Sequence, residues 1–344
     1  MKHKFIITIC LTFMVANNVC HASQQTDTTN VIDYTPKIHG TVRTKFEYQP
    51  EIEKERFEVR NARVSIDGAI SRQISYKAEI DLSDEGQIKM LDAFARFKPT
   101  TASALTLGQM RVPFTIDAHR SPHKQWFANR SFIAKQVGNV RDVGLAGRYD
   151  FNSLLLPLTI EAGIFNGSGL TNQKDYWTNN LNYSAKLQLH LPAKVNVVLS
   201  TQTIKPQEVR IYMWNAGANV EIGNLKFEGE YLFKHYKNDA FKNVNALNTM
   251  VCYDIMLPKI FHKISILGRY DMMTDHSNGK CNNEGKLIID DAARKRVTGG
   301  VTLSLAKPFC ADLRLNYENY FYKKEAVKKV SEQSKIVVEL MVRF

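Results

Sequence analysis

The sequence lacks a long apolar run outside its first 22 residues. No later segment is apolar for the roughly 18 residues that a membrane-spanning helix needs. Mean hydropathy is −0.29 and only 44% of the 344 residues are hydrophobic. These values argue against a helical membrane protein. They do not argue against a transmembrane β-barrel, in which only alternate residues of each strand face lipid.

Cysteine is also scarce. Three of the five cysteines, Cys252, Cys281 and Cys310, lie beyond the first 22 residues, and they are widely spaced. An odd number at such spacing does not specify a disulfide framework, so at most one bridge can form and at least one thiol stays free. No C-x-x-C pair occurs, which removes the usual signature of a zinc or thiol-redox site.

Sequence motifs of catalysis are absent as well. The chain has no G-x-S-x-G, P-loop or G-x-G-x-x-G motif. Ser168 lies in Gly-Ser-Gly, a pattern typical of a turn, and no Ser and His pair suggests an outer-membrane hydrolase. His119 and His123 have a metal-binding spacing only if that segment is helical, and no third ligand is evident. We therefore expect neither enzyme activity, nor a cofactor, nor a metal.

The N-terminus has the pattern of an export signal. Lys2 and Lys4 precede an apolar run from residue 5 to residue 16, and Cys20-His21-Ala22 ends in a small residue before a polar segment. This predicts a cleaved signal peptide over residues 1–22. Residues 23–36 are polar and read as a flexible periplasmic lead-in. Cleavage would leave 44 basic and 34 acidic residues.

Alternation of apolar and polar residues fills the rest of the chain, residues 37–344. One early segment sets Ile38, Gly40 and Val42 against His39 and Thr41. One such segment also suits a half-buried strand of a soluble protein. Sixteen follow one another here, however, and an even number of strands with apolar outer faces is what a closed outer-membrane barrel requires. We predict an all-β, antiparallel barrel of about 16 strands.

The connections between these segments alternate in length. Tight links near Gly68, Pro192 and Gly223 take turns with longer ones, such as 166–180 and 274–293. Short periplasmic turns and long outer loops give this rhythm. A soluble β-sandwich or propeller is the competing fold, but it would not combine an export signal, this rhythm and a terminal Phe344.

The stretch from 108 to 151 contains the most unusual connection. An alternating strand from Gly108 to Phe114 and a second one ending near Phe151 enclose about 25 residues, far more than a hairpin needs, and such loops are usually functional. The segment from Thr115 to Arg141 carries a formal charge of +4, because Asp117 is its only acid. Its cations are Arg120, Lys124, Arg130, Lys135 and Arg141.

Four pieces of sequence, in this order, resemble a known family: GQMRVPF, RDVGLAGRYDF, GIFNGSG and ILGRYDMM. They are similar to the phosphate-selective porin O and P family. The last segment, KIVVELMVRF, looks like the C-terminal signal that outer-membrane barrels present to the barrel-assembly machinery. The resemblance implies a sixteen-stranded barrel in the outer membrane of a Gram-negative bacterium, a homotrimer, and passive diffusion of small anions such as phosphate or polyphosphate.

We expect the long connection between the fifth and sixth strands to fold into the bore as a constriction loop. Rings of arginine or lysine are how anion pores select. We assign anion binding at the constriction to six residues: Arg111, Arg120, Lys124, Arg130, Lys135 and Arg141. Six further cations on the polar faces of strands are expected to line the pore: Arg43, Lys45, Arg63, Arg96, Arg148 and Arg269.

The charge pattern is also compatible with other roles. Glu228 and Glu230 point the same way and could bind cations, although balancing lysines is the simpler role. A loop lying outward would leave a general, weakly selective porin, or a structural or partner-binding component. Basic loops could also serve lipopolysaccharide or polyanion binding, and positive charge on an exported protein does not indicate nucleic acid.

Overall fold

The computed structural model describes residues 33–344, except residues 85, 136–139, 153–155, 171–172, 258–260, 306–309, 324–325 and 327. The signal peptide and most of the lead-in therefore lie outside the described residues. Residues 33–36 of the lead-in are exposed and form no regular element. No helix in the described ranges is long and apolar enough to cross a membrane.

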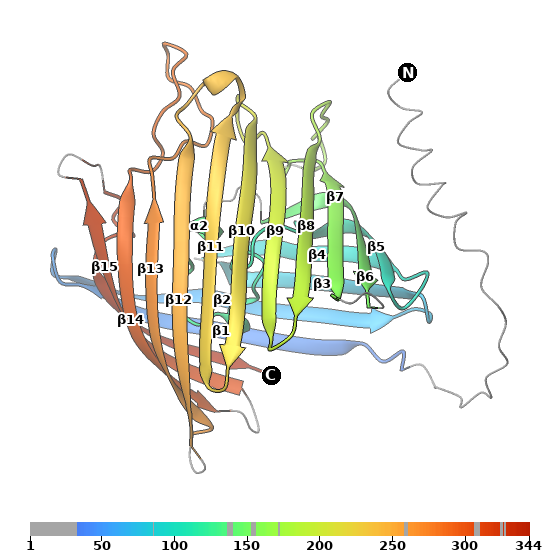
Figure 1. Cartoon of the computed structure of the whole chain (residues 1–344), viewed down its shortest axis with the longest axis horizontal. Helices are drawn as coiled ribbons and strands as arrows, with labels where there is room; N and C mark the ends of the chain where they lie inside the picture. The colour runs from blue at the N-terminus through green and yellow to red at the C-terminus, as the bar shows by residue number, and fades with distance from the viewer. Residues whose placement is uncertain are drawn as a thin grey trace. The chain divides into compact units, whose positions relative to one another are not determined.

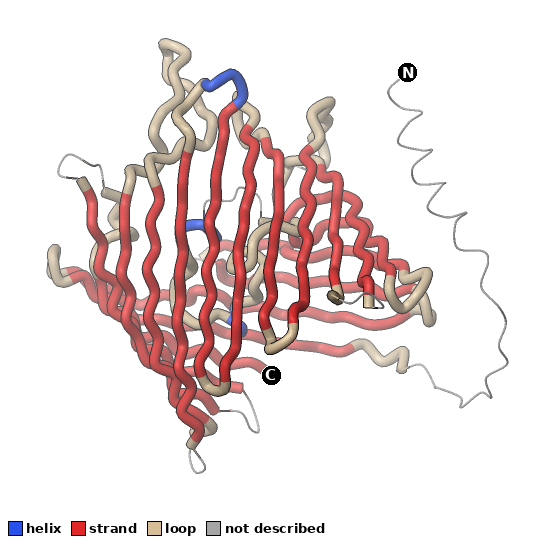
Figure 2. The backbone as a smooth tube through the Cα atoms, viewed as in Figure 1, coloured by secondary structure: helices blue, strands red, loops and turns tan. Residues whose placement is uncertain are grey.

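A single antiparallel sheet of sixteen strands closes into a barrel, as the sequence predicts (Figures 1 and 2). Each strand pairs with its neighbours in sequence, and β1 closes the barrel against β16. The strands are β1 (Lys37–Gln49), β2 (Lys54–Ala69), β3 (Ile74–Asp84), β4 (Gln87–Phe97), β5 (Ser103–Arg111), β6 (Arg141–Phe151), β7 (Leu158–Phe165), β8 (Asn182–Leu191), β9 (Val195–Ile204), β10 (Ile211–Ile222), β11 (Leu225–Tyr236), β12 (Val244–Met256), β13 (Lys263–Met273), β14 (Arg294–Leu305), β15 (Cys310–Tyr322) and β16 (Lys335–Arg343).

Alternation decides which side chains face outward. In β10, Met213 and Asn215 are buried inside the barrel, whereas Trp214 between them is 47% exposed on its outer surface. The same rule puts Arg43 and Lys45 of β1 inside and Val42 outside. An apolar outer face and a polar interior are the arrangement that lipid requires of a barrel.

The two ends of the barrel differ in their connections. At one end β10 and β11 are joined by Gly223 and Asn224 alone, and Gly223 takes a positive φ of 59°. A two-residue hairpin needs that conformation, which costs glycine nothing. The other end carries the longer connections, including residues 166–181 and 274–293, and the short helix η2 (Lys237–Asp239).

The strand expected to reach Phe114 ends earlier, at Arg111. Pro113 has no N–H for a ladder and Thr115 adopts a positive φ of 56°, so the chain leaves the sheet here. Met110 and Val112 are buried against Phe165, and Phe114 belongs to a separate buried apolar cluster. The connection from β5 to β6 therefore spans residues 112–140, and we call it the β5–β6 loop.

Candidate functional site

The β5–β6 loop makes hydrogen bonds to inward-facing residues on strands far apart around the barrel. The Ser184 hydroxyl of β8 donates to the Pro113 carbonyl at 2.7 Å, and the Thr115 N–H donates to Ser200 of β9 at 3.2 Å. Further on, the Ala128 N–H donates to the Asn316 side chain of β15 at 2.8 Å. The Ala128 carbonyl accepts from Arg43 of β1 at 2.6 Å. The loop thus runs inside the barrel from β8 round to β1.

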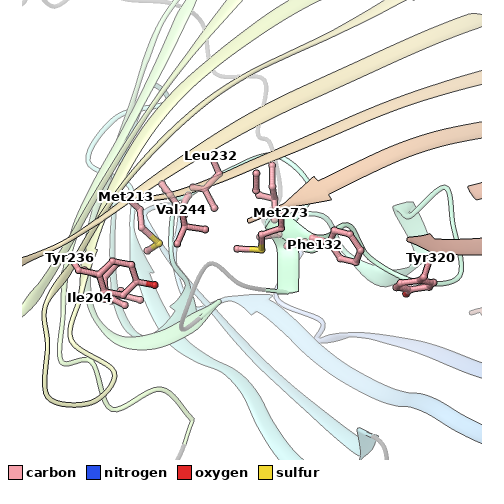
Figure 3. Close-up of a cluster of buried hydrophobic side chains, with 14 residues drawn as sticks. Phe132, Ile204, Met213, Leu232, Tyr236, Val244, Met273 and Tyr320 are labelled. Atoms are coloured by element: carbon pink, nitrogen blue, oxygen red, sulfur yellow. The ribbon is translucent and has the colours of Figure 1, made fainter. Parts of the chain in front are cut away.

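Two phenylalanines fix the second half of the loop to arginines of the wall. Phe127 is 2% exposed and lies under the guanidinium of Arg269, 4.5 Å from the ring centroid. Phe132 is fully buried between Arg294 and Arg296, at 4.5 and 4.7 Å. A cation over an aromatic face is stabilising, most of all where both groups are desolvated. Phe132 begins the short helix α2 (Phe132–Lys135) and packs in the interior apolar cluster of Figure 3.

Asp117 organises the first half of the loop. Its carboxylate accepts from Arg120 at 3.1 Å and from the N–H and hydroxyl of Ser131 at 3.0 and 2.7 Å. Its own N–H donates to Glu230 of β11 at 2.9 Å, and its carbonyl accepts from Arg130. Burial raises the pKa of Asp117, but Arg120, Arg130 and Ser131 together hold it below its ordinary value. The only acid of the loop is therefore its structural centre.

Three of the six predicted constriction cations are neutralised. Arg120 pairs with both Asp117 and Glu228, and Lys135 lies 3.5 Å from Glu332. Arg141 pairs with Asp92 at 2.6 Å and Glu79 at 3.1 Å. Glu228 and Glu230 thus bind the loop rather than balance lysines. A ring of six free cations is not what the structure contains.

The other three predicted constriction residues have no ion pair within the described part of the chain. Arg111 donates to the Ala118 carbonyl at 3.1 Å, and Arg130 donates to the Arg120 carbonyl at 2.7 Å. Lys124, in the short helix η1 (Pro122–Lys124), is exposed. Burial lowers the pKa of Arg130 to about 9, with Arg43, Arg63 and Arg141 adding to this and Asp117 opposing it. Arg130 therefore stays charged at neutral pH.

The pore-lining residues expected from sequence fall into two groups. Arg43, Lys45 and Arg269 are at most 5% exposed, each within ion-pair distance of a carboxylate. Arg63, Arg96 and Arg148 lie on β2, β4 and β6, away from the strands that the loop covers. Arg148 is the most open of them, with 50% of its side chain exposed. Arg96 donates to Thr106 at 3.0 Å.

One interior cation is not among the residues predicted to line the pore. Lys186 of β8 is 7% exposed, and no described carboxylate lies within 4 Å of its ammonium group. The alternating pattern places it on the polar face of its strand, but nothing in that pattern separates it from the other inward lysines. His119 links it to the loop: burial, then Lys186, Arg111 and Arg141, lower the pKa of His119 well below its ordinary value. His119 is accordingly neutral.

Lys186 and the cations of β2, β3, β5, β6 and the loop that lie on the same side of the interior form a group. We call it the basic cluster: Arg63, Lys77, Arg111, Arg130, Arg141 and Lys186. Three carboxylates pair with its members, Glu79, Asp81 and Asp92. Six cations therefore share three paired acids, and a fourth acid, Glu161 of β7, lies directly opposite Lys186 but beyond ion-pair distance. On the far side of the loop, Asp117, Glu228 and Glu230 gather around Arg120, so the charge of the interior is unevenly distributed.

The loop after β7 also has a defined anchor. The carboxylate of Asp142 accepts from the N–H groups of Gly167 and Gly169 at 2.7 and 3.2 Å, and from the Ser168 hydroxyl at 3.4 Å. Gly167 and Gly169 both have a positive φ. Ser168 is thus part of a turn, and two of the recognised sequence pieces, RDVG and GSG, meet in space.

The described His, Cys, Asp and Glu side chains form no metal-binding group and no disulfide. Within the described ranges no three His, Cys, Asp or Glu side chains are grouped to hold a metal ion. Cys252, Cys281 and Cys310 are all free thiols. Cys252 is buried and donates to Asp254 at 3.4 Å, whereas Cys310 is exposed.

Comparison with known proteins agrees with this architecture. The family model of phosphate-selective porin O and P matches residues 32–205, about half of the chain. The chain belongs to this family. It is an outer-membrane porin, and family and fold together indicate a channel rather than an enzyme. No curated protein matches the sequence.

Solved porin structures share the fold at low sequence identity. The anion-selective porin from Comamonas acidovorans aligns with a TM-score of 0.61 at 11% identity, covering 90% of this chain and 98% of that one. OprB of Pseudomonas putida aligns with a TM-score of 0.64 at 9% identity, covering 90% and 93%. The OmpT of Vibrio cholerae solved in a trimer form gives 0.58 at 12%, covering 90% and 98%.

Proposed function

We propose that the porin passes small anions, phosphate among them, through the part of its interior that the β5–β6 loop leaves open. The observation that carries the proposal is the basic cluster, in which Arg111, Arg130 and Lys186 have no described carboxylate within ion-pair distance. Uncompensated cations inside a low-dielectric wall concentrate anions and repel cations. The anion-selective title of the Comamonas relative is in line with this.

The β5–β6 loop would act as the constriction. It is hydrogen-bonded to β8, β9 and β11 at its start and to β1 and β13 to β15 beyond, so the open interior lies toward β2 to β7. On that side the start of the loop contacts the ends of β5 and β7 through Arg111 and Phe165. On that side Lys77 and Arg148 keep 29% and 50% of their side chains exposed. A solute crossing the barrel would pass between this wall, which carries Arg111 at the end of β5, and the face of the loop that carries Arg130.

Guanidinium chemistry favours oxyanions at this point. Arginine presents a planar fork that matches two oxygens of a phosphate, whereas lysine acts as a point charge. Arg111 donates to one backbone carbonyl, that of Ala118, and Arg130 donates to two, those of Asp117 and Arg120. A guanidinium has five N–H groups, so both arginines keep further donors for a ligand. Phosphate would therefore stay longer than chloride and reduce the chloride current.

The proposed function includes an orientation of the barrel in the membrane and an oligomeric state. The end with long connections faces outward, the termini face the periplasm, and Phe344 is presented to the barrel-assembly machinery during insertion. A homotrimer is supported by the trimer form of the Vibrio cholerae OmpT relative. The barrel sits in the outer membrane of a Gram-negative bacterium, where its apolar outer face contacts lipid.

A weakly selective porin is the second candidate. It is favoured by the ion pairs of Arg120, Lys135 and Arg141, which cancel half of the predicted constriction charge. The two candidate functions differ in whether the unpaired positive charge of the basic cluster changes the permeability of the pore to anions relative to cations.

Reversal potential of single channels in a chloride gradient separates the candidates. The variant R111Q/R130Q keeps polar N–H donors but removes two charges, and R72Q, on an exposed turn between β2 and β3, is the matched control. We expect anion preference in the native porin and in R72Q, and a marked loss in R111Q/R130Q. Phosphate should reduce chloride current only where the two arginines remain. Neutral or cation-selective native channels would reject the proposal.

A further inference from the structure

The outer face of β7 to β11 carries a hollow of about 480 Å³. Its floor is made of small side chains, Ala185, Thr201 and Ala216, and larger residues rise around it. The strand register places these residues side by side. Ala185 of β8 lies opposite Thr201 of β9, Thr201 lies opposite Trp214 of β10, and Trp214 lies opposite Phe233 of β11. The rim consists of Ile160, Leu187, Leu199, Trp214, Tyr231 and Phe233. Figure 1 shows these strands side by side on one wall.

The hollow is apolar and open to the membrane. Trp214 is 47%, Leu199 48% and Tyr231 45% exposed. The polar group on the floor is already satisfied, since the Thr201 hydroxyl donates to the Met213 carbonyl at 3.0 Å. An occupant therefore needs no hydrogen-bonding group at this depth, and a hydrocarbon chain fits the chemistry. The volume falls in the usual range of ligand sites.

One cation, Arg210, lies between the hollow and the end of the barrel that carries the long connections. Arg210 precedes β10 and donates to the Thr203 hydroxyl and to the Leu181 carbonyl, both at 3.3 Å. Thr203 lies one outward step beyond Thr201 on β9, so Arg210 sits on the outer surface. No described carboxylate lies within ion-pair distance of it. Tyr212 and His235 stack beneath it, with ring centroids 6.3 Å apart, as aromatic residues do at a membrane boundary.

We propose that this surface binds one membrane lipid with an anionic phosphate headgroup, an acyl chain in the hollow and the phosphate on Arg210. Charge complementarity decides for a lipid over a second copy of the chain. The outward positions of β8, β9 and β10 carry neither acids nor bases, so a similar wall from another copy would cover Arg210 without neutralising it. The proposed lipid site rests on the outer-membrane orientation of the barrel and not on anion selectivity. An experiment can therefore reject the lipid site without rejecting the proposed anion selectivity, and the reverse.

Quenching of Trp214 fluorescence by brominated lipid tests the site in the full-length, reconstituted porin. Trp126 and Trp177 are changed to Phe, which leaves Trp214 as the only tryptophan. Two probes with identical brominated chains are compared, phosphatidic acid and phosphatidylcholine. We expect phosphatidic acid to bind about fivefold more tightly, the preference that one cation near a membrane surface gives.

Two substitutions, each with a matched control, localise the effect. R210A should abolish the preference for phosphatidic acid, whereas R72A, on an exposed turn at the opposite end, should keep it. A185L, which fills the floor, should weaken quenching by both lipids, whereas A62L on the outer face of β2 should not. Equal quenching by both probes, or an unchanged preference in R210A, would overturn the site. The site would also be overturned if neither lipid quenched Trp214 in the native assembly and the variant A216C formed a cross-link to a second copy of the chain.

Discussion

The interior of the barrel has two walls that use the same residue types for different tasks. On the packed wall, which we define as β12 to β16 with β1, the loop covers the cations, and Arg296 and Arg314 are at most 1% exposed. On the open wall, β2 to β7, Lys77 and Arg148 keep 29% and 50% of their side chains exposed. The difference shows that an inward arginine holds the loop where the loop covers it and meets solvent where it does not.

The packed wall works through complete pairing. Arg296 contacts Asp271 at 2.8 Å and Glu318 at 3.3 Å, and donates to the Arg130 carbonyl of the loop at 2.8 Å. Arg314 and Arg43 share the two oxygens of Glu339. Buried pairs of this kind add little net stability, but loss of one partner leaves an uncompensated charge. The wall is therefore sensitive to any single change.

Removal of Arg296 should have the largest effect. R296M leaves Asp271 and Glu318 buried with fewer partners, and we expect a loss of about 3–5 kcal/mol in the free energy of unfolding. Denaturant unfolding of the detergent-folded barrel measures it, with loss of heat-modifiable gel migration as a second readout.

The same change on the open wall is the control. Arg148 pairs with Asp150 at 2.9 Å, but half of its side chain is exposed, so R148M should cost roughly 0–1 kcal/mol. Similar losses for the two variants would remove the distinction between the walls.

A second prediction concerns the seam of the packed wall. The backbones of Gly40 and Phe344 exchange two hydrogen bonds, at 2.9 and 3.1 Å, and a Cβ on Gly40 would lie 2.2 Å from the Phe344 ring. G40A should therefore cost about 1–3 kcal/mol through overpacking. G299A on β14, where a Cβ meets nothing within 4 Å, should be close to neutral.

The double variant G40A/F344A makes the comparison stricter. Truncating the ring removes the clash, so the double variant should be more stable than G40A alone, by denaturant unfolding after assembly. The experiment also separates a structural role of Phe344 at the seam from its proposed role in insertion. A double variant no better than G40A would show that the clash is not the cause.

A third prediction uses pH to loosen the loop from the walls. The pKa of Asp117 is held below its ordinary value of 3.8, so its carboxylate stabilises the loop above that pH and the contribution is lost as the pH falls through the lowered value. Emission of Trp126, whose ring lies 5.6 Å from the Arg120 guanidinium, reports the change when Trp177 and Trp214 are changed to Phe.

We expect Trp126 emission to stay constant from pH 7 to about pH 4 and to shift to the red below it, as the ring meets water. D117N should show the shifted emission at pH 7 already, whereas D175N, on an exposed connection, should behave as the native porin. An unshifted D117N would mean that Ser131 and Arg130 position the loop without the charge.

The walls also show where sequence reasoning reaches its limit. Alternation predicts the barrel, its sixteen strands and the inward direction of Arg43, Arg63 and Arg269, because side-chain direction in a strand has a period of two. It cannot predict which inward cations are paired, because pairing depends on register. Asp271 and Arg296 meet because β13 and β14 place them directly opposite, and 24 residues of chain separate them.

The loop is where prediction was weakest. Its length and charge indicate function, but Phe127 and Phe132 give no sign in sequence that they lie under arginines of β13 and β14. For Lys186 the sequence predicts the position on the polar face of the strand. It does not predict that no described carboxylate pairs with Lys186, because that depends on the positions of Glu161 and Glu230 in the folded barrel. The ion pairs of Arg120, Lys135 and Arg141 could not be predicted for this reason, since Glu79, Asp92, Glu228 and Glu332 are contributed by distant strands and loops.

The smallest predicted effect tests whether the open side of the interior senses a single charge. K186Q removes a cation that has no described ion pair, so the fold should lose little, and the anion-to-cation permeability ratio should fall about twofold at 0.1 M salt, where the Debye length is about 10 Å. At 1 M salt screening shortens that length to about 3 Å, and the difference should disappear. K295Q removes the same charge from the outer surface of β14 and should change the ratio at neither concentration. Equal shifts in K186Q and K295Q would show that net charge, and not a cation placed inside the barrel, sets the preference of the pore.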